Sequence, residues 1–108
     1  MRRTLSVARV TVPAELQTEY LAVIRELVAI QEARGRRLWI FRSRRAADVF
    51  LECSESPSFE THRSQAERTP REQQLEKRLR QLGAYEPGGL DLFEEVPVEL
   101  ALTGRTLD

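Results

Sequence analysis

The sequence is poor in several features that mark particular classes of protein. Its single cysteine, Cys53, excludes an intrachain disulfide and favours a reducing compartment. No apolar run approaches the roughly 18 residues that a membrane span needs, and the first residues are not followed by the apolar core of a signal peptide. We therefore expect a soluble, cytoplasmic protein that does not associate with membranes.

Neither sign of charge is in excess, because 17 basic residues balance 17 acidic ones. This balance removes the long-range positive field of proteins that hold nucleic acid through its phosphates. With 108 residues the chain is long enough for one hydrophobic core. We expect a single domain over residues 1–108, with its core at about 7–100 and a frayed tail at 101–108.

Histidine occurs once, at His62. A metal or heme site is not expected, because neither a second histidine nor a suitable Cys/His spacing accompanies it, and we predict no cofactor. One imidazole with a near-neutral pKa is still the group best suited to proton transfer in this chain. The alternative is a histidine on a helix surface that contacts only solvent or a backbone carbonyl.

Hydrophobic periodicity predicts a strand followed by a long helix near the N-terminus. Residues 7–12 alternate as a half-buried strand does, with Ala8, Val10 and Val12 on one face. Pro13 suits the first turn of a helix. The predicted helix covers residues 14–34 and ends at Gly35. Its inward positions are Leu16, Tyr20, Val23, Ile24, Leu27, Val28 and Gln31.

The middle of the chain predicts a β-hairpin and then a broken helical region. Residues 37–43 and 48–54 are rich in β-branched and aromatic side chains, but the turn at 44–47 lacks glycine and asparagine, so its register stays open. Ser56 can cap a helix, and a second capping box begins at Thr69. We expect a break near Pro70, then a stripe of leucines and an end at Gly83. The stripe is Leu75, Leu79 and Leu82.

A fourth strand is expected at residues 90–93, with residues 96–100 continuing it as a bent or edge segment. The order of elements is then β-α-β-β-α-β. This order is typical of the α+β, ferredoxin-like fold, in which two helices cover one face of a four-stranded antiparallel sheet.

The predicted hairpin carries apolar side chains on both of its faces. Leu38 and Ile40 point one way, and Trp39 and Phe41 point the other. A two-layer monomer would leave the second set in water, where a large apolar patch is a liability. We infer a homodimer that packs two sheets together. The alternative is a monomer with a strand that is merely rich in hydrophobic residues.

One stretch resembles a known family. Residues 49–62 read VFLECSESPSFETH, and this stretch is similar to a strand bearing a glutamate, a short turn and a histidine-bearing helix in the antibiotic biosynthesis monooxygenase family of the dimeric α+β barrel superfamily. The resemblance implies a homodimeric barrel with a pocket between sheet and helices in each subunit. Family members oxidise quinols or polyketide aromatics without a cofactor, and a related group degrades heme.

The chain departs from this family at two points. Active sites of the heme-degrading relatives and of several monooxygenases use an Asn, a Trp and a His, but this sequence contains no asparagine. Cys53 also stands where the family often has tryptophan. The resemblance therefore transfers only His62 and Glu52.

These observations give a set of candidate site residues. We expect His62 to be the catalytic proton acceptor of a cofactor-independent monooxygenase that acts on a small aromatic or quinol-like molecule. The alternative is a non-catalytic dimeric module of the same fold that binds a ligand or a partner. The expected substrate-binding residues are Trp39, Phe41, Phe50, Phe59, Tyr20 and Arg42.

Each of these binding residues also has a simpler interpretation. The aromatic side chains can belong to the core or to the dimer interface, and Arg42 can be a solvated strand end. Cys53 is interpreted as a small buried hydrophobic residue.

Basic residues cluster around the predicted hairpin, at Arg34, Arg36, Arg37, Arg42, Arg44 and Arg45. RNA-binding domains share the β-α-β-β-α-β order, but they need exposed aromatics in a basic, glycine-containing strand motif that residues 36–41 lack. We therefore do not expect nucleic-acid binding. The acidic stretch over residues 86–99 is an alternative partner for these arginines.

Overall fold

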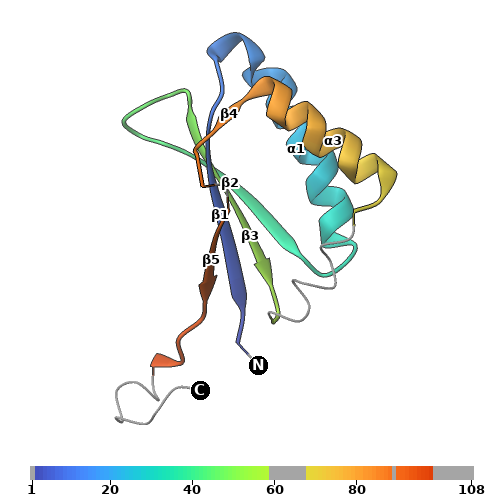
Figure 1. Ribbon diagram of the computed structural model, residues 1–108, viewed down its shortest axis with the longest axis vertical. Coiled ribbons are helices and arrows are strands. Elements are labelled where there is room, and N and C mark those ends of the chain that lie inside the picture. Colours follow the sequence, from blue (N-terminus) through green and yellow to red (C-terminus); the bar gives the residue numbers. More distant parts are fainter. Residues whose placement is uncertain (1, 59–67, 89, 99–108) are drawn as a thin grey trace.

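The computed structural model describes residues 2–58, 68–88 and 90–98, which form a sheet with two helices on one of its faces (Figure 1). No helix within these ranges has the length and apolar character needed to cross a membrane. The elements in chain order are β1 (Thr4–Thr11), the short 3-10 helix η1 (Ala14–Leu16), α1 (Gln17–Glu32), β2 (Arg37–Arg42), β3 (Val49–Ser56), α3 (Pro70–Leu82), β4 (Ala84–Tyr85) and β5 (Asp91–Glu94).

Among the described residues the sheet is antiparallel and has five strands, in the order β2-β3-β1-β4, with β5 also paired to β1. β4 pairs with the end of β1, at Val10 and Thr11, and β5 pairs with its beginning, from Thr4 to Val7. These two short strands together occupy the place of the fourth strand in a ferredoxin-like fold. The predicted α+β fold is thus confirmed, with an interrupted edge strand.

The prediction for this edge was partly wrong. The strand expected at residues 90–93 is present as β5, but the second piece of the edge precedes it as β4 rather than following it. Residues 96–98 lie outside the strands, and Pro97 has no N–H to donate to a neighbouring strand. The rest of this predicted segment and the predicted tail, residues 99–108, lie outside the described residues.

The N-terminal predictions agree with the structure. Ala8, Val10 and Val12 are buried on one side of β1, and the predicted helix begins as η1 and continues as α1. Gly35 adopts a left-handed backbone with a φ of 81°, a conformation that glycine tolerates best. The Arg36 N–H then donates to the Gln31 carbonyl at 3.0 Å, so the chain reverses direction at this point.

The hairpin has the register Arg37↔Glu55 to Arg42↔Phe50. Its loop contains no glycine, and a serine side chain organises it instead. Ser43 Oγ accepts hydrogen bonds from the N–H groups of Arg45 and Ala46 at 3.1 and 3.2 Å. This local turn explains how the hairpin closes without the residues that usually mark one.

The second helix begins as predicted at Thr69, whose side chain and that of Glu72 form a reciprocal capping box. The predicted cap at Ser56 is wrong, because Ser56 is the last, fully buried residue of β3. Gly83 does end α3, but for a different reason than a left-handed turn. A Cβ atom at Gly83 would lie 2.5 Å from Val10 Cγ2, so glycine is needed for close packing of the helix end on β1.

The core lies between the sheet and the two helices. Val10 and Phe50 contribute from the sheet, Tyr20, Ile24 and Leu27 from α1, and the predicted leucine stripe from α3. Tyr20 and Phe50 pack with ring centroids 5.2 Å apart. This cluster fills one half of the inner face, and the other half leaves an open space between sheet and helices.

Candidate functional site

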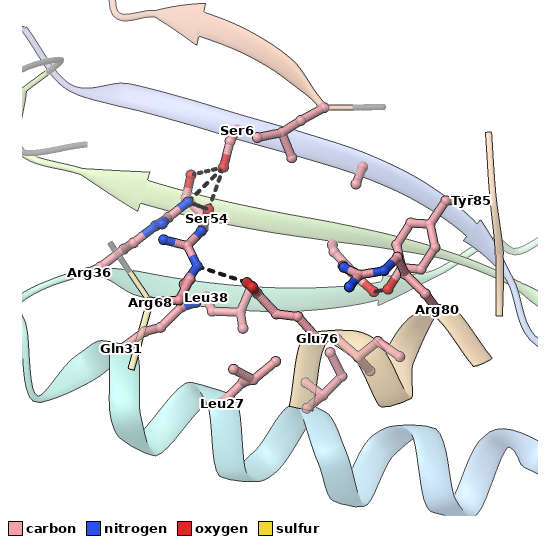
Figure 2. A pocket seen from close by; sticks show the side chains of 15 residues that line it. Ser6, Leu27, Gln31, Arg36, Leu38, Ser54, Arg68, Glu76, Arg80 and Tyr85 are labelled. Carbon is pink, nitrogen blue, oxygen red and sulfur yellow. Dashed lines mark hydrogen bonds and ion pairs between the residues drawn. The ribbon is translucent and has the colours of Figure 1, made fainter. Parts of the chain in front are cut away.

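The open space is a cavity of about 390 Å³ between the sheet and the helices (Figure 2). The strands create it by the size of their inward side chains. Ser6 and Ala8 of β1 and Ser54 of β3 are small, whereas Val10 and Phe50, nearer the other end of the same two strands, fill the core. A run of small residues beside large ones therefore leaves a pocket of the size typical of small-molecule sites.

Apolar side chains form much of the wall of this cavity. Ile24 and Leu27 contribute from α1, Leu38 from β2 and Leu79 from α3. Hydrophobic walls of this kind suit a flat apolar molecule, with the few polar groups fixing its orientation.

One polar group in the cavity is the Glu52 carboxylate, held by two phenols. Tyr20 and Tyr85 each donate a hydrogen bond to Glu52 Oε2, at 2.7 and 2.6 Å. Burial raises the pKa of Glu52 above its usual value, although the hydrogen bonds from Tyr85 and Tyr20 oppose the shift. Burial and the adjacent Glu52 charge likewise raise the pKa of both tyrosines, which stay protonated as donors.

A second polar group is Arg36, whose side chain is only 5% exposed. Its Nη2 donates to Ser54 Oγ at 2.7 Å and to Ser6 Oγ at 3.3 Å, and these two serine hydroxyls also contact each other. Burial lowers the pKa of Arg36 from its usual value. The tight turn at Gly35 directs this guanidinium inward from the start of β2.

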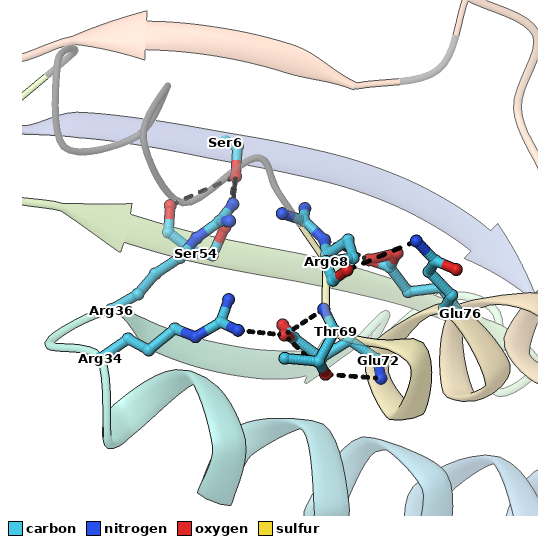
Figure 3. Close-up of polar contacts among 9 residues, drawn as sticks. Ser6, Arg34, Arg36, Ser54, Arg68, Thr69, Glu72 and Glu76 are labelled. Atoms are coloured by element: carbon cyan, nitrogen blue, oxygen red, sulfur yellow. Dashed lines mark hydrogen bonds and ion pairs between the residues drawn. The ribbon is translucent and has the colours of Figure 1, made fainter.

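Ion pairs occupy the region between Arg36 and α3 (Figure 3). Glu72, which is 1% exposed, accepts from Arg34 at 2.6 Å while it also completes the helix cap. One turn further along α3, Glu76 accepts from Arg68 at 2.8 Å. Within the three described ranges, no group of three His, Cys, Asp or Glu side chains could hold a metal ion.

The predicted site residues that the structure describes do not gather in this cavity. Tyr20 and Phe50 lie in the core beside it, and Tyr20 reaches it through its hydrogen bond to Glu52. Arg42 lies at the end of β2, where its Nη2 donates to Gln17 Oε1 at 3.1 Å and its Cζ lies 5.0 Å from the centre of the Phe50 ring.

Two further candidates, Trp39 and Phe41, lie away from the cavity. Trp39 and Phe41 pair with Cys53 and Leu51 on the sheet face that points away from the helices. Arg37 covers the Trp39 ring at 4.8 Å. His62 and Phe59 lie outside the described residues.

The basic cluster is not one surface. Arg36 points into the interior and Arg34 pairs with Glu72, whereas the remaining four arginines belong to β2 and its loop. The acidic stretch meets other arginines than those considered from the sequence. Glu86, Glu94 and Glu95 pair with Arg9, Arg2 and Arg3 along β1.

Three functional candidates in the cavity were not singled out from the sequence as a site: Arg36, Tyr85 and Arg68. Arg36 was considered only as part of a basic cluster. The alternation of side chains along β3 predicts part of this site. Glu52 and Ser54 fall on the same face as Phe50 and therefore point inward. Polar residues on a covered face indicate either a network or a site.

No family model matches the chain, and no curated protein matches it significantly. Solved structures do match. SnoaB, a cofactor-independent oxygenase from Streptomyces nogalater, aligns with a TM-score of 0.71 and 19% identity over 89% of this chain and 95% of its own. A "putative antibiotic biosynthesis monooxygenase" from Caulobacter crescentus CB15 aligns with a TM-score of 0.74 and 17% identity over 88% and 91%.

A third structure, a conserved Bacteroides thetaiotaomicron protein described as a "possible oxidoreductase", aligns with a TM-score of 0.73 and 21% identity over 87% of this chain and 98% of its own. These identities are low, so the likeness concerns the backbone. The chain therefore has the ferredoxin-like fold of the antibiotic biosynthesis monooxygenase-like proteins, as the resemblance of residues 49–62 implied.

Proposed function

We propose that the chain is a cofactor-independent monooxygenase that oxidises a small aromatic or quinol-like molecule in the cavity between sheet and helices. The observation that carries this proposal is the cavity of about 390 Å³ itself, with apolar walls and the Glu52 carboxylate inside. Its volume is within the range of small-molecule sites. The likeness of the fold to SnoaB, which is named a cofactor-independent oxygenase, supports the same reaction class.

The reaction needs a base and a substrate that forms a stable anion. For an anthrone, the base takes one proton from the ring CH₂ group, and the resulting carbanion transfers an electron to O₂. Recombination forms a C–O bond to a peroxide. Loss of the second ring proton and cleavage of the O–O bond then leave a ketone and water, so that one oxygen atom stays on the substrate. The substrate itself supplies all the electrons.

His62 is the base that we propose, because it is the one imidazole in the chain. Glu52 is the second candidate, because it lines the cavity and burial moves the pKa of its carboxyl toward neutrality. Aromatic residues near the cavity, with Tyr20 and Phe50 in the described core, would flank a flat ring. For Trp39, Phe41, Phe59 and Arg42, a role in binding stays a prediction.

We further propose that the active form is a homodimer that packs through the outer sheet face. Phe41 and Phe93 are 55% and 54% exposed there, next to Leu5, Trp39 and Leu51. Exposed aromatic side chains with aliphatic neighbours on an uncovered sheet face are usual for a protein interface and unusual for a monomer surface.

The test is oxygen uptake with a panel of quinols and anthrones, for wild type, His62→Ala and Glu52→Gln. Loss of a general base lowers the rate by about 10²–10⁴-fold, so one of the two variants should fall by that factor. Glu32→Gln, at an exposed position near the end of α1, is the matched control. Wild-type rates in His62→Ala would exclude His62 as the base, and wild-type rates in both variants would exclude the proposed chemistry.

One observation favours a non-catalytic ligand-binding module as the second candidate. Glu52 Oε2 already accepts from two tyrosines, as a purely structural carboxylate would. In that case the wild type would bind aromatic ligands in the cavity, and oxygen uptake would equal the rate without protein for every member of the panel.

A further inference from the structure

Arg36 is a buried cation whose hydrogen bonds are incomplete. Its side chain is 5% exposed and lines the cavity, and its Nη2 contacts only the hydroxyls of Ser54 and Ser6. In the part of the chain that the structure describes, its Nε–H has no hydrogen-bond partner. A buried donor without an acceptor is costly, and more so when it carries charge.

The carboxylates near Arg36 are already engaged by other arginines. Glu72 pairs with Arg34 at 2.6 Å, and Glu76 pairs with Arg68 at 2.8 Å (Figure 3). Across the described ranges, no carboxylate forms an ion pair with Arg36. Hydroxyl oxygens stabilise a guanidinium less than a carboxylate does, so one positive charge at this end of the cavity is left over.

The neighbouring polar group is also incomplete. Gln31 lines the same cavity, is joined to Arg36 by a backbone hydrogen bond, and leaves its buried Oε1 without a partner among the described residues. An unpartnered donor and an unpartnered acceptor thus belong to residues that line the same cavity. Figure 2 shows Arg36, Ser6 and Ser54 at one end of the cavity and Tyr85 and Arg80 at the other.

We propose that Arg36 is the anchor for a carboxylate on the ligand, so that the cavity takes an aromatic carboxylic acid. The ligand carboxylate accepts from the Arg36 Nε–H, and the ring lies against Leu27, Leu38 and Leu79. This arrangement neutralises the buried charge only when the cavity is filled. It deepens the proposed function by naming the class of substrate, and it places the ring between Arg36 and Glu52.

The experiment compares two probes of the same shape, 2-naphthoate and its neutral isostere 2-naphthamide, by calorimetric titration of the full chain under argon. A charge-assisted hydrogen bond in a buried site favours the carboxylate by about ten- to a hundredfold in Kd. In Arg36→Met, which keeps a long apolar side chain without charge, this preference should disappear. Arg44→Met removes an exposed arginine from the hairpin loop and should retain it.

Three results would overturn the proposal: equal affinity of the wild type for both probes, an unchanged preference in Arg36→Met, or no binding of 2-naphthoate at millimolar concentration. Circular dichroism tests whether Arg36→Met is folded. If it is not, Arg36→Lys replaces it. Lysine keeps the charge but lacks the Nε–H of the planar fork, and it should show a preference between that of the wild type and none.

The two proposals fail separately. Binding under argon needs no oxygen chemistry, so a preference for 2-naphthoate without oxygen uptake from any quinol would leave the anchor standing and exclude the monooxygenase. Oxygen uptake together with equal affinity for the two probes would do the reverse.

Discussion

The two faces of the sheet differ in polarity, and the difference is the opposite of what burial alone would predict. The inner face, which the helices cover, carries Ser6, Glu52 and Ser54, whereas the outer face, which the chain leaves open, carries Trp39 and Phe41. The covered face is thus the more polar over about half of its length. Side-chain hydrophobicity alone therefore does not identify which face of a sheet is the core.

Each face carries side chains whose interactions are only partly satisfied. Inside, the Arg36 Nε–H lies at the cavity and has no hydrogen-bond partner among the described residues. Outside, Phe41 and Phe93 are more than half exposed, although each pairs across strands with a leucine. Because we propose an aromatic carboxylic acid for the cavity and a second copy of the chain for the outer face, substitutions on the two faces should have separable effects.

The largest effect is expected on the outer face. Trp39→Glu would place an unpaired charge in the proposed dimer interface, at a cost of about 3–5 kcal/mol, which is on the order of a thousandfold in the dimer Kd. Light scattering should then report a 12.5 kDa species, while Arg44→Glu in the hairpin loop stays dimeric. A mass of 12.5 kDa for the wild type at micromolar concentration would refute the proposed dimer through the outer face.

On the inner face, Leu79→Ala should lower the free energy of unfolding by about 2–5 kcal/mol, because it opens a void beside the cavity in the core. The same substitution at Leu21, which is 40% exposed on α1, should change it by less than about 0.5 kcal/mol. Urea unfolding measures both. Similar losses in the two variants would mean that α1 and α3 do not bury this face as described.

A smaller loss is expected at the end of α3. Gly83→Ala brings a Cβ atom to 2.5 Å from Val10 Cγ2, and overpacking of this kind costs about 1–3 kcal/mol. Val10→Ala removes the conflicting methyl groups, so Gly83→Ala should cost less in that background. A double-mutant cycle from thermal unfolding tests this coupling, and strict additivity would refute the close approach.

The smallest effect concerns pH. Burial raises the pKa of Glu52 above its usual value of 4.5, so the folded state binds this proton more tightly than the unfolded chain does. Its contribution to stability is fully present below pH 4.5 and is lost as the pH rises through the folded pKa. The wild type should therefore lose stability relative to Glu52→Gln over that interval. Parallel pH profiles of the two proteins would contradict the burial of an ionisable carboxyl here.

The element order, the inward faces of β1 and α1, and the cap at Thr69 could all be predicted from the sequence, because periodicity and local hydrogen bonding determine them. The edge strand could not be predicted, because β4 has only two residues and its place in the sheet comes from its pairing with β1. The hairpin register depends on Ser43, a residue that is not a specific turn signal.

The candidate site was harder to predict than the fold. Aromatic character predicts Trp39 and Phe41 as binding residues, but both point away from the cavity. Arg36 belongs in sequence to a cluster of arginines, and the sequence does not show that it alone of them is buried. A cavity arises from the sizes of side chains on several strands together. In the sequence, the resemblance over residues 49–62 and the alternation of the strand both indicate Glu52.

The interrupted edge strand also affects how the protein folds. In the part of the chain that the structure describes, the side of β1 opposite β3 is covered by β4 and β5 alone, and the pairing Thr4↔Glu94 closes a loop of most of the chain. Contacts between residues so distant in sequence form late, because the entropy of closing the loop must be overcome first. On the ribosome, β1 would therefore keep one unpaired edge until residue 94 has emerged, and this interval is when the nascent chain is most exposed to strand exchange with its neighbours.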